Sequence, residues 1–453
     1  MRTFLTIWVG QVISVLGSGL TNFALGVWIF QQTGEATPFA LTVLFGNLPQ
    51  VLLSPLAGAL IDRWNRRLVL IVADTGSALT TFGAFLLLLN GELQVWHIFI
   101  IAAVGSVFQG FQEPAYMASI TMLVPKEQLG RASGMVQMGQ ALTSLISPLL
   151  AGFLFVAIGL EGIILVDFAT FFFAIGALLF VRIPQPKSSV ESAEGEKPSV
   201  WQDAAYGWRY VRERQGLFGL LWYFAMVNFF LNFSSVLAPP MILSFADADA
   251  LGLVQAAGGL GMLLGSIIMS AWGGPKRAIL GVIGFISLIG VGFLIMGLQA
   301  SILVISAGIF IGLFAIPIAA GTSQVIFQRK VAPDVQGRVF AIRAMISRSM
   351  MPLAFLLAGP LADRVFIPML SPGGGLSDSI FAALVGVGAG RGIGLLFVFS
   401  GAFVVLVSIL AFANPRIRNV ESELPDLLPE DEEESDAVEE NVSIDATLFP
   451  SES

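Results

Sequence analysis

The sequence contains no cysteine and only one histidine, His97, among its 453 residues. The absence of cysteine excludes disulfide bonds and thiolate metal sites, and a single histidine cannot form a zinc site alone. A membrane-embedded enzyme would need a constellation such as H-E-x-x-H or a nucleophilic cysteine, and the sequence has neither. We therefore expect no metal or other cofactor and no enzymatic activity.

Charged residues are also scarce. They make up 12% of the chain, whereas 56% of the residues are hydrophobic and the mean hydropathy is +0.84. A soluble domain usually has about 25% charged residues, so this composition indicates a protein whose solvent is the lipid bilayer. We expect no nucleic-acid partner. The 37 phenylalanines and 49 glycines suit helices that present aromatic side chains to lipid and small residues to one another.

Apolar runs of about 20 residues, the length of helix that crosses the hydrocarbon core, recur along the chain. The first run has a basic start but continues past the length of a signal peptide, so we expect it to remain as the first spanning helix. The ends of the predicted helices are least clearly marked by charged or turn residues at 159–162 and near Pro239 and Pro240. The runs predict twelve transmembrane helices, at approximately 4–30, 38–61, 68–89, 95–117, 133–158, 162–181, 217–243, 250–272, 278–298, 301–326, 340–361 and 392–413.

The basic residues are distributed unevenly between the two ends of these helices. With the N-terminus on the cytoplasmic side, 19 of the 23 lysine and arginine residues fall in cytoplasmic loops or tails. Basic residues are retained on that side of a membrane. The distribution therefore predicts a cytoplasmic N-terminus, and the even number of helices places the C-terminus on the same side.

The regions outside the helices differ from them in composition. Residues 420–453 hold 13 acidic and no basic residues and lack apolar periodicity, which predicts a disordered cytoplasmic tail. In the central loop, Trp201, Ala205, Trp208 and Val211 share one face of an expected amphipathic helix at the inner leaflet. We expect an N-terminal six-helix bundle at 1–182, a cytoplasmic linker with this helix at 183–216, a C-terminal six-helix bundle at 217–414 and the acidic tail at 415–453.

Two short sequence matches indicate an internal duplication. A shift of 207 residues aligns EQLGR at 127–131 with DVQGR at 334–338, and LLAG at 149–152 with LLAG at 356–359. Either match alone could arise by chance, but both occur in one register and at equivalent places in the topology. They favour two homologous halves related by pseudo-symmetry.

A cluster of charge lies between the second and third predicted helices. Residues 58–67 read GALIDRWNRR and resemble the G-x-x-x-D-R/K-x-G-R/K-R/K signature of the major facilitator superfamily. Asn65 replaces the usual glycine, which is compatible because asparagine also adopts left-handed conformations. The resemblance implies an all-α membrane protein with twelve transmembrane helices in two pseudo-symmetric six-helix bundles. The matching residues, which we expect to form a cytoplasmic gate, are Gly58, Asp62, Arg63, Arg66 and Arg67.

The acid of this signature has an expected partner. We expect the Asp62 carboxylate to accept hydrogen bonds from the N-terminus of the eleventh helix and to hold the two halves together on the cytoplasmic face. Such a contact must break when the protein opens inward. The alternative is that the arginines only fix the topology. The second half retains Gly265, Lys276 and Arg277 but has Met269 at the acidic position.

Further segments resemble the macrolide-efflux and enterobactin-exporter branch of the superfamily, among them FQEPAY at 111–116 and AGPLADRVFIPML at 358–370. The resemblance covers the chain apart from the tail and is more specific for fold than for substrate. In the fifth helix, SPLLAG resembles a degraded antiporter motif G-P-x-x-G-G, and a packing role alone is the alternative. The residues of this motif are Ser147, Pro148, Ala151 and Gly152.

Carboxylates inside predicted spans are candidates for proton coupling, because a charged side chain at the centre of a membrane helix costs roughly 2.5–3.5 kcal/mol on insertion scales. They are Glu113 in the fourth helix, Asp167 in the sixth and Asp74 in the third. Arg343 and Arg348 in the eleventh helix could pair with an acid. Binding of a cationic substrate at Glu113 and structural pairing between helices are the alternatives.

Polar amides in the predicted helices suggest a central cavity. Sparse amides beside many aromatic residues suit a bulky amphipathic solute better than a small sugar or a charged phosphate. Hydrogen bonding between helices is the alternative for each amide. The candidate cavity residues are Asn22, Gln50, Gln109, Gln112, Asn228 and Asn232.

These features together predict a secondary active transporter of the bacterial inner membrane. The resemblance implies proton-coupled efflux of a drug, macrolide or siderophore-like molecule by alternating access. We expect a small-molecule substrate, protons and the lipid bilayer as partners, and a monomer. An importer of the same fold, or a homologue that has lost transport and serves as a receptor or scaffold, remains open.

Overall fold

The computed structural model describes residues 2–61, 64–125, 128–181, 208–331 and 336–423. Within these ranges all regular structure is helical, and eleven helices are long and apolar enough to cross a membrane. The acidic tail beyond 423 and most of the expected linker lie outside the described residues. The N-terminal half contains α1 (Arg2–Thr33), α2 (Ala36–Ile61), α3 (Arg66–Leu89), α4 (Val95–Leu123) and α5 (Leu129–Phe180).

The C-terminal half contains the remaining helices. Its long helices are α7 (Gln215–Leu243), α8 (Ala248–Trp272), α9 (Ala278–Leu298), α10 (Ile302–Lys330), α11 (Gln336–Leu361) and α14 (Arg391–Ala413). Its short elements are a π-helical turn (Ala362–Phe366), α12 (Ile367–Met369), α13 (Ile380–Val385), α15 (Pro415–Arg418) and α16 (Val420–Glu423).

Helix α5 consists of two spanning segments. Gly159 has non-helical torsion angles, φ 66° and ψ −174°, which only glycine adopts without strain. Gly139 before it and Ala177 after it both lie against the start of α1, so the chain folds back at Gly159. With its two segments counted separately, the described residues contain the twelve spans that the sequence predicts.

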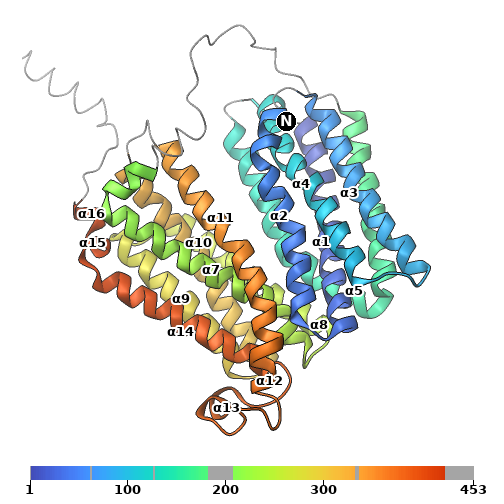
Figure 1. Cartoon of the computed structure of the whole chain (residues 1–453). Coiled ribbons are helices and arrows are strands. Elements are labelled where there is room, and N and C mark those ends of the chain that lie inside the picture. Colours follow the sequence, from blue (N-terminus) through green and yellow to red (C-terminus); the bar gives the residue numbers. More distant parts are fainter. Residues whose placement is uncertain (1, 62–63, 126–127, 182–207, 332–335, 424–453) are drawn as a thin grey trace, which may run out of the picture.

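The two ends of the helices differ in charge. We call the basic end the one at which α1, α3 and α9 begin, and it carries Arg66, Arg67, Arg277 and Lys330. We call the far end the one at which α2, α4 and α8 begin. The two halves meet at the far end and diverge toward the basic end, where the N-terminus lies (Figure 1).

Contacts between the halves concentrate at the far end. One buried apolar cluster combines Val27 and Leu44 of the N-terminal half with Val236, Leu251 and other residues of the C-terminal half. The clusters nearer the basic end each belong to one half. The structure is therefore a form in which the far end is closed.

Two close helix crossings form this closure. A Cβ atom added to Gly152 on α5 would lie 2.6 Å from the carbonyl oxygen of Ala248 on α8. A Cβ atom added to Gly359 on α11 would lie 2.5 Å from Cα of Thr37 on α2. Gly152 and Gly359 are the glycines of the two LLAG segments. Two residues that the 207-residue shift aligns, Gly152 and Gly359, thus have the same role, since each permits a close helix crossing between the halves.

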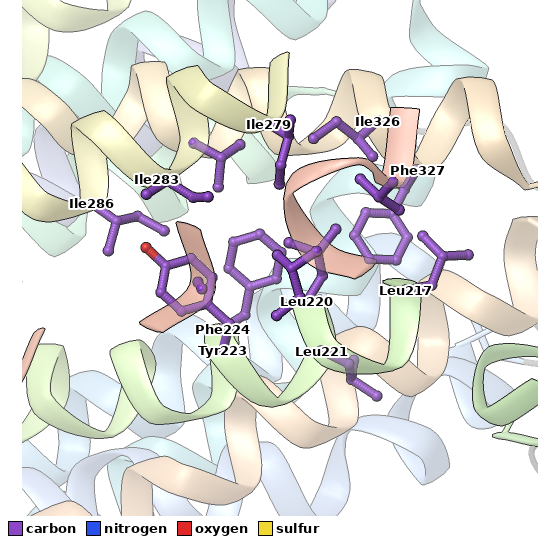
Figure 2. Packing of buried hydrophobic residues seen from close by; sticks show 14 of the residues in the cluster. Leu217, Leu220, Leu221, Tyr223, Phe224, Ile279, Ile283, Ile286, Ile326 and Phe327 are labelled. Carbon is purple, nitrogen blue, oxygen red and sulfur yellow. The ribbon is translucent and has the colours of Figure 1, made fainter. Parts of the chain in front are cut away.

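The core of the C-terminal half lies near the basic end. Tyr223 and Phe224 of α7 pack against isoleucines of α9, and the ring of Phe224 lies near that of Phe327 on α10 (Figure 2). Tyr210 and Val211, just before α7, are buried in the same cluster. The described part of the expected amphipathic helix thus packs on the C-terminal half, while Trp201 and Ala205 lie outside the described residues.

Two helices of this half continue through proline. Pro239 and Pro240, near which the sequence marks a boundary poorly, lie inside α7 and are buried. Helix α11 contains Pro360 and continues through the π-helical turn to Met369. This extension exceeds the predicted end at 361 and carries Asp363 to the far end.

Candidate functional site

A cavity of about 380 Å³ is lined by α1, α2, α3, α4 and both segments of α5, and we call it the main cavity. Most of its lining side chains are polar. All three acids that the sequence predicts, Asp74, Glu113 and Asp167, line it. Four of the six predicted amides line it as well: Asn22, Gln50, Gln109 and Gln112.

Asp74 on α3 is buried, with 5% of its surface exposed. Gln11 Nε2 on α1 donates a hydrogen bond to Asp74 Oδ2 at 3.0 Å. Gln112 Nε2 on α4 donates to Asp74 Oδ1 and, at 3.1 Å, to Oε1 of Gln11. The three side chains link α1, α3 and α4 in one closed network.

Asp167 lies on the second segment of α5 and is also buried, with 7% exposed. Ser18 Oγ on α1 donates to Asp167 Oδ1 at 3.4 Å. Gly17 makes room for it, since a Cβ atom there would lie 2.8 Å from Asp167 Oδ1. Small and hydroxylated residues of α1 therefore form the surroundings of this acid.

Glu113 on α4 differs from the two aspartates because its side chain is exposed to the cavity. Gln50 Nε2 on α2 donates to Glu113 Oε2 at 3.3 Å. Glu113 also lines a smaller side pocket of about 150 Å³ together with Trp8, Tyr116 and Met117. A carboxylate beside aromatic and thioether groups is a suitable surface for a lipophilic cation.

No lysine, arginine or histidine lines the main cavity in the described part of the chain. Arg343 lies in the C-terminal half, where its Nη2 donates to Ser323 Oγ at 2.8 Å and its Nη1 to Gln324 Oε1 at 3.4 Å. Arg348 is exposed. The pairing of these arginines with a cavity acid, which the sequence leaves open, is not found in this structure.

Two predicted cavity residues lie elsewhere. Asn228 Nδ2 donates to the carbonyl oxygen of Phe224 at 2.8 Å, and Asn232 Nδ2 donates to that of Asn228 at 2.7 Å. Both amides thus bond to the preceding turn of α7, and neither lines the main cavity.

Several cavity residues are absent from the sequence-based prediction. The main cavity includes Ser14 and Ser18 with Asn22, and Gln11 belongs to the Asp74 network. Positions 11, 14, 18 and 22 recur at helical spacing, so a polar stripe on α1 is the signal that could identify them. Gln140 and Thr143 on α5 complete the polar lining.

The site continues into an apolar cavity of about 330 Å³ between the two halves, which we call the apolar extension. Its lining includes Phe23 and Phe39 from the N-terminal half and Leu251 from the C-terminal half. Asn22 lines both the extension and the main cavity. Gln255 on α8 supplies a polar group from the C-terminal half. The combined site has a polar and an apolar part.

A family model for the Major Facilitator Superfamily matches residues 7–355. The chain belongs to this superfamily. It is 28% identical over 371 residues to macrolide efflux protein A of Streptococcus pyogenes, an alignment that covers 80% of this chain and 90% of that protein. It is 24% identical over 359 residues to the multidrug efflux pump Tap of Mycolicibacterium fortuitum, covering 77% of this chain and 86% of that protein.

Solved facilitator structures share the fold at low sequence identity. A bacterial homologue of the human lysosomal transporter Spinster, described as inward-facing and unoccupied, matches with a TM-score of 0.62 and 15% identity over 90% of this chain and 96% of that chain. The nucleoside transporter NupG matches with a TM-score of 0.63 and 13% identity over 91% of this chain and all of that chain. The predicted fold is thus confirmed.

In this facilitator, the described part of the superfamily signature ties helices of the N-terminal half together. Arg66 Nη1 donates to the carbonyl oxygen of Ala118 at 2.7 Å. Arg67 donates to the carbonyl oxygens of Leu178 and Leu179, both at 2.8 Å, at the end of α5. Cations at the C-terminal end of a helix are stabilised by its dipole. Asp62 and Arg63 lie outside the described residues.

The remaining signature positions have local roles. Gly58 lies in the last turn of α2. Asn65 caps α3 by accepting a hydrogen bond from Leu68 N at 3.2 Å, with φ −67°. The asparagine therefore serves as a helix cap in an extended conformation, and the left-handed conformation expected from the glycine it replaces is not adopted.

The SPLLAG segment of α5 lies at the closure between the halves. Ser147 Oγ donates to the carbonyl oxygen of Leu16 at 3.2 Å. Ala151 is fully buried, and a Cβ atom added to Gly252 of α8 would lie 2.5 Å from the carbonyl oxygen of Pro148. Together with Gly152, these residues permit the close approach of α5 to α1 and α8.

A hydrogen-bonded contact accompanies the second crossing. Asp363, just after α11, accepts hydrogen bonds from Ala36 N at 2.9 Å, Thr37 N at 2.7 Å and Thr37 Oγ1 at 2.5 Å. Its carboxylate therefore caps the N-terminus of α2 from the other half. A sequence signal for this residue exists, since LAGPLADR at 357–364 repeats LAGALIDR at 56–63 with six of eight residues identical.

Proposed function

We propose that this facilitator is a proton-coupled secondary transporter that exports bulky amphipathic molecules by alternating access. The observation that carries the proposal is one cavity that joins three acids and several amides, closed at the far end by contacts between the halves. The efflux relatives support the direction of transport. The basic end is assigned to the cytoplasm of a bacterial cell, with both termini there, because basic residues concentrate at that end.

The shape of the site supports an amphipathic substrate. A solute in the main cavity meets amides, hydroxyls and carboxylates, whereas the apolar extension offers Phe23, Phe39 and Leu251. The apolar extension thus provides the apolar surface typical of sites for drug-sized ligands, and the main cavity provides the polar groups that orient them. The substrate is therefore expected to place its polar groups beside Glu113 and its apolar body toward α8.

The acids divide by exposure into two proposed roles. Glu113 is exposed to the cavity and is placed to meet a cationic group of the substrate. Asp74 and Asp167 are buried without a cation in the cavity lining, and a charge held inside a membrane helix is costly. Uptake and release of a proton at these two residues is the proposed coupling step. A membrane potential adds about 2.3 kcal/mol per charge per 100 mV to such an exchange.

Alternating access requires the far end to open. In the structure a solute can leave the site toward the far end only after the α2–α11 and α5–α8 crossings separate, since Gly359 and Gly152 bring the backbones into contact there. The cytoplasmic gate at Gly58, Asp62, Arg63, Arg66 and Arg67 would then close the basic end. Exchange between these two forms is the proposed transport cycle.

Purified protein in proteoliposomes tests the proposal, with erythromycin and the dye ethidium as probes. The wild type is expected to accumulate a probe against its gradient when a pH gradient is imposed. Asp167→Asn and Asp74→Asn are expected to abolish this accumulation and to retain probe exchange without a gradient. If the rate and extent of transport do not depend on the pH gradient, proton coupling is excluded. If no flux of either probe is measured, a receptor or scaffold role is favoured.

The same preparation separates the role of Glu113. Glu113→Gln is expected to raise the KM for ethidium, a permanent cation, by roughly tenfold, the effect of about 1.4 kcal/mol, and to leave accumulation by the pH gradient intact. Glu92→Gln, which changes an exposed carboxylate in the turn between α3 and α4, is the control. If Glu113→Gln abolishes accumulation and leaves the KM unchanged, Glu113 is the coupling residue instead.

A further inference from the structure

A second polar cavity lies inside the N-terminal half, and we call it the outer chamber. It has a volume of about 310 Å³ and is lined by α1, α2, α3, α4 and the second segment of α5. No residue of the C-terminal half is in its lining. It therefore runs within one half, whereas the apolar extension, with which it shares Asn22, lies between the halves and leads toward the closed crossings.

The outer chamber joins the main cavity at a polar neck. Six residues line both cavities, and all six are polar: Ser18, Asn22, Ser77, Thr81, Gln109 and Asp167. From Gln109 the chamber follows α4 back to Ile98, a distance of about 16 Å at 1.5 Å per residue. Since α4 begins at Val95, the chamber reaches within one helical turn of the far end.

Apart from Asp167, its polar lining consists of hydroxyl and amide side chains. Thr42 Oγ1 donates to the carbonyl oxygen of Pro38 at 2.9 Å, and Thr80 Oγ1 donates to that of Ser77 at 2.7 Å. With these protons committed to the backbone, the hydroxyl oxygens face the chamber as acceptors. A polar space of this size has room for about ten waters at roughly 30 Å³ each. Asp167 is the one titratable residue in its lining.

Apolar side chains line the chamber toward its far end. Ile98 is completely buried and Leu25 is 7% exposed, and both line the chamber. If water connected the far side continuously to Asp167, protons could cross the protein without any transport of substrate. Leu25 and Ile98 are therefore the candidates for a barrier between the chamber and the far side.

We propose that the outer chamber is the route by which protons from the far side reach Asp167, while the substrate uses the separate path between the halves. The inference rests on the proposed proton coupling. When Leu25 and Ile98 move apart, a hydronium ion in the chamber transfers a proton to the Asp167 carboxylate and becomes water. The resulting carboxylic acid later donates the proton to a water molecule in the main cavity. This step regenerates the carboxylate and forms a hydronium ion, so the transfer is balanced.

A leak measurement tests the route without any substrate. Proteoliposomes containing the full chain and an internal pH-sensitive dye are exposed to an acid step outside. Ile98→Ala and Leu25→Ala shorten the apolar closure and are expected to acidify the interior several-fold faster than the wild type. Addition of Asp167→Asn to either variant is expected to return the rate to that of the wild type.

The matched control is Ile163→Ala. Ile163 is completely buried and belongs to the same apolar cluster as Ile98 and Leu25, but it does not line the chamber. It is expected to leave the leak at the wild-type rate. The proposal is overturned if neither chamber variant leaks, if the leak persists with Asp167→Asn, or if Ile163→Ala leaks equally.

The leak also separates this inference from the proposed function. A leak that depends on Asp167 establishes the route even if substrate flux in the wild type proves independent of the pH gradient. Conversely, a gradient-driven wild type whose chamber variants do not leak retains the proposed function and loses the outer chamber as its proton route.

Discussion

Replacement of Asp363 by asparagine is expected to favour opening of the far end. The Asp363 carboxylate accepts three hydrogen bonds from the first two residues of α2, and this contact joins the two halves. Hydrogen bonds to a charged group contribute about 1.5–3 kcal/mol each and are not additive. Asparagine retains one acceptor oxygen and loses the charge, so we take a loss of ~2 kcal/mol, which corresponds to a ~30-fold change in the ratio of closed to open forms.

The naturally cysteine-free chain makes the measurement direct. Spin labels on Glu92→Cys and Asp378→Cys, both exposed at the far end on opposite halves, report the closed and open populations as two distances. Asp363→Glu should retain most of the closed form, and Glu35→Gln, an exposed acid next to the start of α2, should not alter it. Equal populations in the wild type and in Asp363→Asn would refute the assignment of this contact to closure.

The closure and the cavity give two further predictions. Gly252→Leu is expected to prevent closure of the far end, because a Cβ atom there would already lie 2.5 Å from the carbonyl oxygen of Pro148. The same spin labels should then report the open distance. A closed population equal to that of the wild type would contradict the role of this crossing in closure. Asn228→Ala and Asn232→Ala are expected to change the KM for ethidium by less than about twofold from that of the wild type, which corresponds to less than 0.5 kcal/mol. The reason is that both amides bond to their own helix. A tenfold rise in the KM would place them in the site.

The helices follow closely from hydropathy because a spanning segment must satisfy its backbone internally and remain apolar over its length. The predicted helix at 278–298 has the bounds that the structure gives α9. Helix α11 is longer than predicted, since Asp363 and Arg364 interrupt the apolar run while the backbone continues to Met369. Hydropathy thus locates a span but does not fix where its last turn ends.

The cavity is less predictable because hydropathy does not set the rotation of a helix in a bilayer. Side chains that face lipid and side chains that face other helices are both apolar, so a polar residue can turn toward the cavity or toward its own backbone. Gln109 and Gln112 do the former, whereas Asn228 and Asn232 do the latter. Only a stripe of several polar residues, such as that of α1, indicates the face in advance.

The LAGxLxDR segment occurs twice in the sequence, and its aspartate, Asp62 in the first copy and Asp363 in the second, follows the last residues of α2 and of α11. Asp363 caps α2 in this far-end-closed form, and Asp62 is the acid we expect to cap α11 when the basic end is closed. If both contacts act in this way, Asp62→Asn should favour the inward-open form as Asp363→Asn favours the outward-open form. Asp363 does not line the main cavity, so the probe affinity of Asp363→Asn should remain close to that of the wild type.

The double variant provides the decisive comparison. If each contact stabilises one of the two forms, the two losses shift the equilibrium in opposite directions. Effects of substitutions at distant sites with no shared partners usually add. We expect the double variant to return the distance populations toward those of the wild type while exchanging between the two forms faster, because both have lost a stabilising contact. If Asp62→Asn leaves the populations unchanged alone and in the double variant, residues 58–67 act only as a topology signal, and Asp363 alone biases the equilibrium.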